Sequence, residues 1–138
     1  MVSTTKNSGF TLMELVIGLI IVGLIAAIGI PVYQRFVERG KETATNENIR
    51  LLKSSIQLFQ MDAGGYPTKL KDLEKRPTDE KFKTKWRGPY IETVPEEDGW
   101  SNPFVYKVTP GQKKPFELYS HGPNGPGSPK EERIGEYN

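Results

Sequence analysis

A single apolar run near the start of the chain constrains its fold more than any other feature. Between Phe10 and Val32 the only charged residue is Glu14. About 20 apolar residues in a helix, at 1.5 Å rise each, cover the roughly 30 Å hydrocarbon core of a bilayer. The sequence therefore predicts a membrane-spanning helix over residues 10–32. Because a carboxylate in such a segment is costly and usually functional, we expect Glu14 to have a partner of opposite charge.

The residues ahead of this run form a short polar leader with one cation, Lys6. A secretory signal peptide carries its small-residue cleavage site after the apolar core, whereas here the small residue Gly9 precedes it. Cleavage after Gly9 would remove residues 1–9 and leave the helix as an anchor that begins at Phe10. The alternative is an ordinary signal anchor that contains a stray glutamate.

The helical pattern continues beyond the apolar run with a different periodicity. Pro31 closes the run, and inside a helix a proline removes a backbone hydrogen bond and kinks or breaks the chain. An apolar stripe at helical spacing follows within residues 33–63, formed by Ile49, Leu52, Ile56 and Phe59. Glycines at 64 and 65 end the pattern. We expect one long helix, apolar in its first half and amphipathic in its second.

Residues 64–138 form a small head of short elements. A short helix is expected around residues 70–73, an exposed charged loop over 74–87, and a brief extended piece over 91–94. Residues 104–108 and 116–119 are predicted to be hairpin strands joined by a proline–glycine turn. Two strands alone are marginal in water, so we expect them to pack on the apolar stripe. The fold class is therefore α+β.

Composition argues against catalysis and against nucleic-acid binding. The formal net charge is +2, there is no cysteine, and the single histidine, His121, lies in a glycine–proline loop. The acidic run 96–98 is expected to be a solvated turn, because a glycosidase pair needs a shaped cleft. Trp86 and Trp100 are expected to be core or groove-covering residues. No phosphate-binding glycine loop or zinc spacing is present, and we predict a protein that is not an enzyme.

Residues 9–14, Gly-Phe-Thr-Leu-Met-Glu, resemble the processing site of class III signal sequences, found in type IV prepilins and type II secretion pseudopilins. The resemblance implies that a prepilin peptidase cuts after Gly9 and methylates the new amino terminus of Phe10. It also implies that Glu14 pairs with the Phe10 amine of a neighbouring subunit in a filament.

Several head segments are similar to those of the major pseudopilins of type II secretion systems. The matching stretches are Tyr66-Pro67-Thr68, Gly88-Pro89-Tyr90-Ile91, residues 98–106 and residues 118–125. The resemblance covers nearly the whole chain and implies a type IV pilin-like fold. In that fold a long N-terminal helix packs on a small antiparallel sheet with a C-terminal loop region.

The same resemblance implies a structural calcium ion in the C-terminal loop. By that resemblance the metal ligands are Asn124, Glu131 and Glu132, and we expect Ser120, backbone carbonyls and water to complete the shell. An asparagine, however, stands where the family has an aspartate, and Arg133 follows the acidic pair. Calcium takes six to eight oxygen ligands, several of them usually carboxylates. The alternative is a loop held without metal by Pro123, Pro126, Pro129 and the flanking aromatic residues.

The resemblance implies a structural subunit that polymerises with itself into the periplasmic pseudopilus of a type II secretion system. The expected partners are the prepilin peptidase, minor pseudopilins and inner-membrane secretion assembly proteins. The chain is expected to cross the bacterial inner membrane once, with its head in the periplasm. Two alternatives stay open: a type IV pilin of a surface fibre for adhesion, twitching or DNA uptake, and a membrane-tethered periplasmic binding module or hydrolase.

Overall fold

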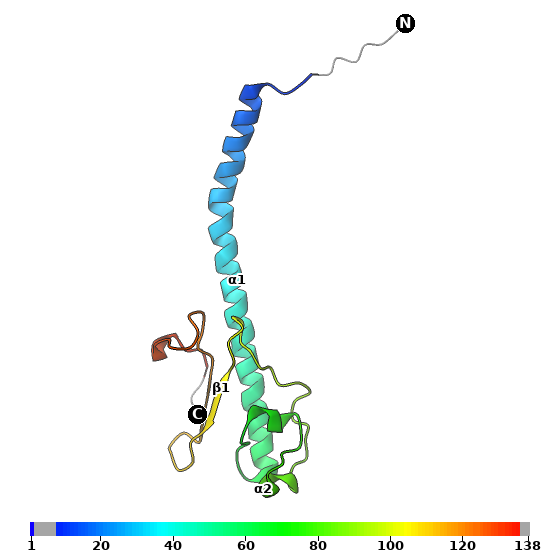
Figure 1. Cartoon of the computed structure of the whole chain (residues 1–138), viewed down its shortest axis with the longest axis vertical. Coiled ribbons are helices and arrows are strands. Elements are labelled where there is room, and N and C mark those ends of the chain that lie inside the picture. Colours follow the sequence, from blue (N-terminus) through cyan, green and yellow to red (C-terminus); the bar gives the residue numbers. More distant parts are fainter. Residues whose placement is uncertain (2–7, 136–138) are drawn as a thin grey trace. The chain divides into compact units, whose positions relative to one another are not determined.

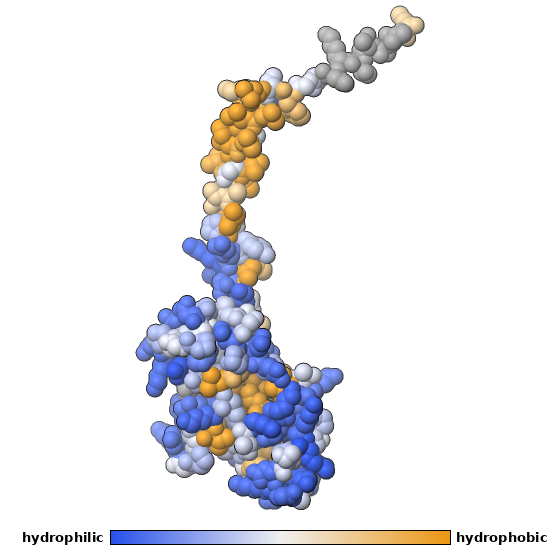
Figure 2. All heavy atoms as spheres, viewed as in Figure 1, coloured by the Kyte–Doolittle hydropathy of each residue, from blue (hydrophilic) through white to orange (hydrophobic). Residues whose placement is uncertain are grey.

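The computed structural model describes residues 1 and 8–135, and the chain divides into two compact units, Met1–Glu38 and Arg39–Asn138. Helix α1, Leu12–Ala63, contributes its first part to one unit and its remainder to the other (Figure 1). Hydrophobic side chains gather along the first part, where nearly all of them are exposed (Figure 2). By length and composition this helix can cross a membrane, whereas polar residues predominate on the face of the second unit that Figure 2 shows.

Pro31 lies inside α1 and does not break it, so the prediction of one long helix is confirmed. A proline removes only one hydrogen bond from the ladder, and the helix continues for 52 residues in all. The helix ends at Ala63, where Gly64 and Gly65 predict its end. Gly64 has a φ of +73°, and its N–H donates to the carbonyl of Gln60 at 2.9 Å.

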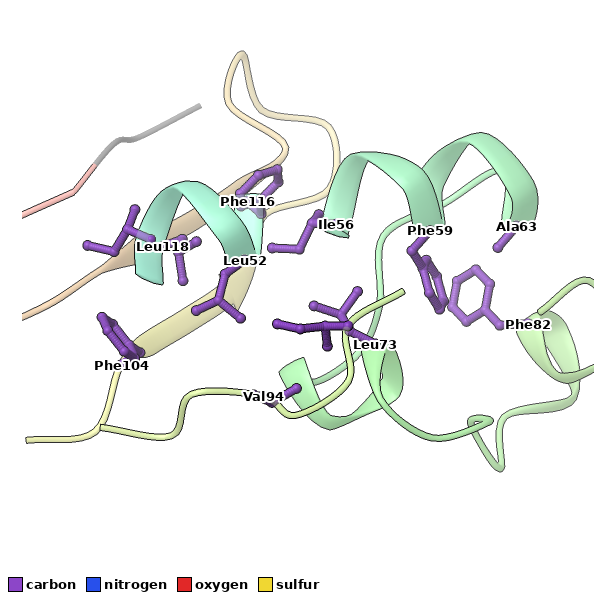
Figure 3. Packing of buried hydrophobic residues seen from close by; sticks show 12 residues of the cluster. Leu52, Ile56, Phe59, Ala63, Leu73, Phe82, Val94, Phe104, Phe116 and Leu118 are labelled. Carbon is purple, nitrogen blue, oxygen red and sulfur yellow. The ribbon is translucent and has the colours of Figure 1, made fainter. Parts of the chain in front are cut away.

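The predicted stripe on α1 is buried and forms one wall of the hydrophobic core. Strands β1, Val105–Val108, and β2, Phe116–Tyr119, pair antiparallel with Val105 opposite Tyr119. Side chains from this hairpin, including Phe116 and Leu118, join the same core cluster as Leu52, Ile56 and Phe59 (Figure 3). The prediction that the hairpin packs on the stripe is therefore confirmed.

The segment between α1 and β1 differs from the sequence-based expectation at two places. Beyond the short 3-10 helix η1, Leu70–Leu73, the expected exposed loop contains helix α2, Glu80–Lys83. Asp79 caps α2, and Phe82 is buried edge-on to Phe59 with ring centroids 5.4 Å apart. Phe82 and Trp86 thus anchor to the core a segment whose many charged residues predict exposure to solvent. Residues 91–94 form no strand, although Ile91 and Val94 are buried.

Candidate functional site

The first functional region is the start of α1, where Thr11 and Glu14 bind each other. Glu14 Oε2 accepts hydrogen bonds from the Thr11 backbone N–H at 2.8 Å and from Thr11 Oγ1 at 3.1 Å. In return, the Glu14 backbone N–H donates to Thr11 Oγ1 at 3.2 Å. This is a capping box, in which a threonine before the helix and a glutamate three residues later satisfy each other's free N–H groups.

The capping box gives Glu14 a local role that our reading of the sequence missed. The Thr-x-x-Glu spacing over residues 11–14 was the available signal. A carboxylate in the first turn also interacts favourably with the positive end of the helix dipole. Gly9 and Phe10 lie outside the helix and are exposed, so the expected cleavage point is accessible in the chain.

The second region is the C-terminal loop, which ends in the short helix η2, Lys130–Glu132. Of the four candidate metal ligands, the structure brings two together: Asn124 Nδ2 donates to Glu132 Oε2 at 2.7 Å. Ser120 is fully buried, and its hydroxyl donates to Asp98 Oδ2 at 2.5 Å while accepting from the Gly122 N–H at 2.9 Å. Glu131 is exposed. The four residues thus do not converge on one point.

This donor set does not fit a calcium ion. The Ser120 hydroxyl already has a donor and an acceptor, and Asn124 directs its amide N–H, not its oxygen, at the Glu132 carboxylate. Within residues 8–135, no three acidic or histidine side chains gather closely enough to share a metal. A calcium shell needs six to eight oxygens. Calcium binding by this loop stays a prediction that the geometry does not favour.

Asp98 is a structural centre that sequence reasoning placed wrongly in solvent. Its neighbours Glu96 and Glu97 are exposed, but Asp98 is buried. Its Oδ1 accepts from the N–H groups of Trp100 and Asn102, each at 2.9 Å, and its Oδ2 accepts from Ser120. The carboxylate therefore organises its own turn and joins it to the C-terminal loop.

The turn that contains Asp98 and Gly99 is held against α1. The N–H of Gly99 donates to the buried Thr45 Oγ1 at 2.9 Å, and an added Cβ on Gly99 would lie 2.6 Å from the Lys41 carbonyl oxygen. Only glycine allows this approach. A continuous set of contacts thus runs from the amphipathic half of α1 through Gly99 and Asp98 to Ser120.

The remaining candidate groups have packing roles. His121 is half-buried and lies edge-on to Tyr119 with ring centroids 5.5 Å apart. Trp86 packs on the core and donates its indole N–H to the Asp72 carbonyl at 2.9 Å. Trp86 is therefore part of the core, as we expected from the sequence.

Comparison with known proteins identifies a family for this chain. A family model described as type II secretion system protein G matches residues 33–136, and a prokaryotic N-terminal methylation motif matches residues 4–30. The type II secretion system core protein G of Pseudomonas aeruginosa is 32% identical, with 96% of each chain covered. That of Escherichia coli K12 is 30% identical over 89% of this chain and 86% of the relative.

A solved structure shows the same fold. The crystal structure of the major pseudopilin from the type 2 secretion system of enterohaemorrhagic E. coli aligns with a TM-score of 0.56 at 24% identity. The alignment covers 70% of this chain and 85% of the other. The architecture is thus that of a pilin-like protein, with a long N-terminal helix on a small antiparallel sheet.

The chain belongs to the type II secretion system protein G family. Its relatives are core proteins of type II secretion systems, and its fold is that of a major pseudopilin. The methylation motif implies processing by a prepilin peptidase and assembly into that filament, and the apolar part of α1 indicates membrane anchoring.

Proposed function

We propose that the chain is cut between Gly9 and Phe10, waits in the bacterial inner membrane with its head in the periplasm, and then polymerises into a periplasmic filament. The observation that carries the proposal is the order of features at the N-terminus. An exposed glycine–phenylalanine pair, followed by Thr11, precedes a helix whose apolar first part holds a single carboxylate. Methylation of the Phe10 amine would follow cleavage, as the matched motif implies.

Glu14 is the residue to which we assign subunit pairing. Within one chain Oε2 binds Thr11, so the carboxylate is held at the helix start before assembly. When apolar helices pack together, water leaves and a carboxylate needs a positive partner. Cleavage creates one such group, the Phe10 ammonium of a neighbouring copy. We propose that this amine pairs with Glu14 in the filament.

Three variants separate pairing from capping. Glu14→Ala loses both, Glu14→Gln keeps an oxygen for the cap but loses the charge, and Thr11→Val keeps the charge but removes the threonine hydroxyl. If pairing is the role, both Glu14 variants are processed normally yet assemble poorly, whereas Thr11→Val assembles. Leaving one buried charge unpaired costs about 3–5 kcal/mol, which is at least a hundredfold in each contact.

The assay is filament yield in sheared fractions, together with the intact mass of the mature chain. A mass that begins at the methylated Phe10 supports the cleavage site. A mass that begins at Met1 contradicts it. Normal assembly of Glu14→Gln would show that capping is the only role of the carboxylate.

The wider role is tested by secretion. We propose that filament growth, with minor pseudopilins and inner-membrane assembly proteins as partners, moves folded proteins across the outer membrane without any catalysis by this chain. Deleting the gene should trap exoproteins in the periplasm, and complementation should return them to the medium. Unchanged secretion with loss of surface fibres would indicate a type IV pilin instead.

A further inference from the structure

We infer that the C-terminal loop, residues 120–134, is closed by its own side chains and backbone and does not use a metal ion. This inference concerns the stability of the head and stands independently of the filament proposal. It rests on three contacts that tie together parts of the loop that a bound cation would otherwise have to hold.

The first contact closes the base of the loop. Ser120 and Ile134 form an isolated antiparallel bridge, with N–H to carbonyl distances of 2.7 and 3.0 Å. The Ser120 hydroxyl binds Asp98 at 2.5 Å. Because Ser120 is fully buried, these bonds are shielded from water. The two ends of the loop are therefore fixed to each other and to the head.

The second contact crosses the middle of the loop. Asn124 Nδ2 donates to Glu132 Oε2 at 2.7 Å, over eight residues of sequence. A neutral amide offers both a donor and an acceptor, and only its N–H side attracts a carboxylate. Nearby, the backbones approach so closely that a Cβ on Gly122 would lie 2.6 Å from the Glu132 carbonyl oxygen. The Asn124 amide N–H thus contacts the Glu132 carboxylate directly, in the place where a bound cation would otherwise contact it.

The third contact involves the cation that follows the acidic pair. The Arg133 guanidinium lies 4.5 Å from the centre of the Tyr119 ring, a cation–π contact beside the base of the loop. Residues 120–134 hold two acidic side chains, Glu131 and Glu132, and two basic ones, Lys130 and Arg133. The loop therefore lacks the excess negative charge with which proteins attract a divalent cation.

The test is thermal unfolding of the full chain in detergent, followed by tryptophan fluorescence, in 1 mM EGTA and in 1 mM calcium chloride. The expected Tm is the same in both. A rise of about 4–8 °C or more in calcium, the shift expected when a domain of this size gains one substantial contact, would overturn the inference. This comparison uses the unaltered protein, so it does not depend on the folding of any variant.

Two substitutions sharpen the result. Asn124→Asp places a second carboxylate against Glu132, so its Tm should fall in EGTA and recover at least in part when calcium is added. Glu131→Gln is the matched control, because Glu131 is exposed and takes no part in the three contacts. Its Tm should equal that of the unaltered chain in both buffers. If Glu131→Gln instead abolished a calcium response of the unaltered chain, the loop would be a metal site.

Discussion

Replacing Asp98 with alanine should destabilise the head far more than its position in an acidic run suggests. The change leaves the buried Ser120 hydroxyl without its acceptor, which costs about 1–3 kcal/mol. It also removes two hydrogen bonds from the N–H groups of Trp100 and Asn102. Both residues are half-buried, so water can replace part of that loss. We expect a total on the order of 3 kcal/mol.

A loss of this size corresponds to a fall in Tm of about 12–24 °C for a head of roughly 100 residues. The assay is thermal unfolding of the full chain in detergent. Glu97→Ala is the control, because this neighbouring carboxylate is exposed and its loss should change stability by about 0.5 kcal/mol or less.

A double variant identifies the cause. If Asp98 acts through Ser120, adding Ser120→Ala to Asp98→Ala should cost much less than Ser120→Ala does alone. Equal Tm values for Asp98→Ala and Glu97→Ala would refute the reasoning. Full additivity of the Asp98 and Ser120 substitutions would show that the two side chains do not act together.

Three further predictions use the same unfolding assay. Leu52→Ala should lower the free energy of unfolding by about 2–5 kcal/mol, because Leu52 is fully buried. The adjacent Leu51 is half exposed, so Leu51→Ala should cost little, and similar losses for the two variants would contradict the burial of Leu52 in the core. Gly122→Ala should lower Tm more than Gly111→Ala, because both have a φ near +78° but only the Cβ at 122 meets a facing carbonyl; equal shifts would exclude that close approach. Burial raises the pKa of Tyr106, whose hydroxyl donates to the Pro67 carbonyl at 2.8 Å. The stabilisation that the neutral Tyr106 side chain gives the head is therefore complete below the unfolded pKa near 10 and is lost as pH rises above it. Tyr106→Phe should lower Tm at pH 7 and weaken this alkaline loss, and an unchanged alkaline profile would refute the assignment.

Local features of the chain were sufficient to predict most of the architecture. The apolar run, the stripe from Ile49 to Phe59 and the glycines after Ala63 predict α1, and alternating aromatic segments predict β1 and β2. These patterns act through local geometry and hydrophobic periodicity, which a sequence displays directly. The processing motif at Gly9 and Phe10 is likewise a contiguous signal, and the matched methylation motif covers it.

Tertiary structure decided which polar residues are buried and what they bind. A run such as 96–98 looks uniformly solvated because composition does not show which side chain the fold turns inward. Asp98 is buried because its carboxylate oxygens accept hydrogen bonds from N–H groups of its own turn and from a hydroxyl 22 residues away. The hydrogen bond across the C-terminal loop likewise forms only because Asn124 directs its amide N–H, and not its oxygen, at Glu132. The sequence by itself determined a membrane helix with an amphipathic continuation, since periodicity and length are local, whereas hydrogen-bond partners far apart in the chain exist only once the backbone has been folded.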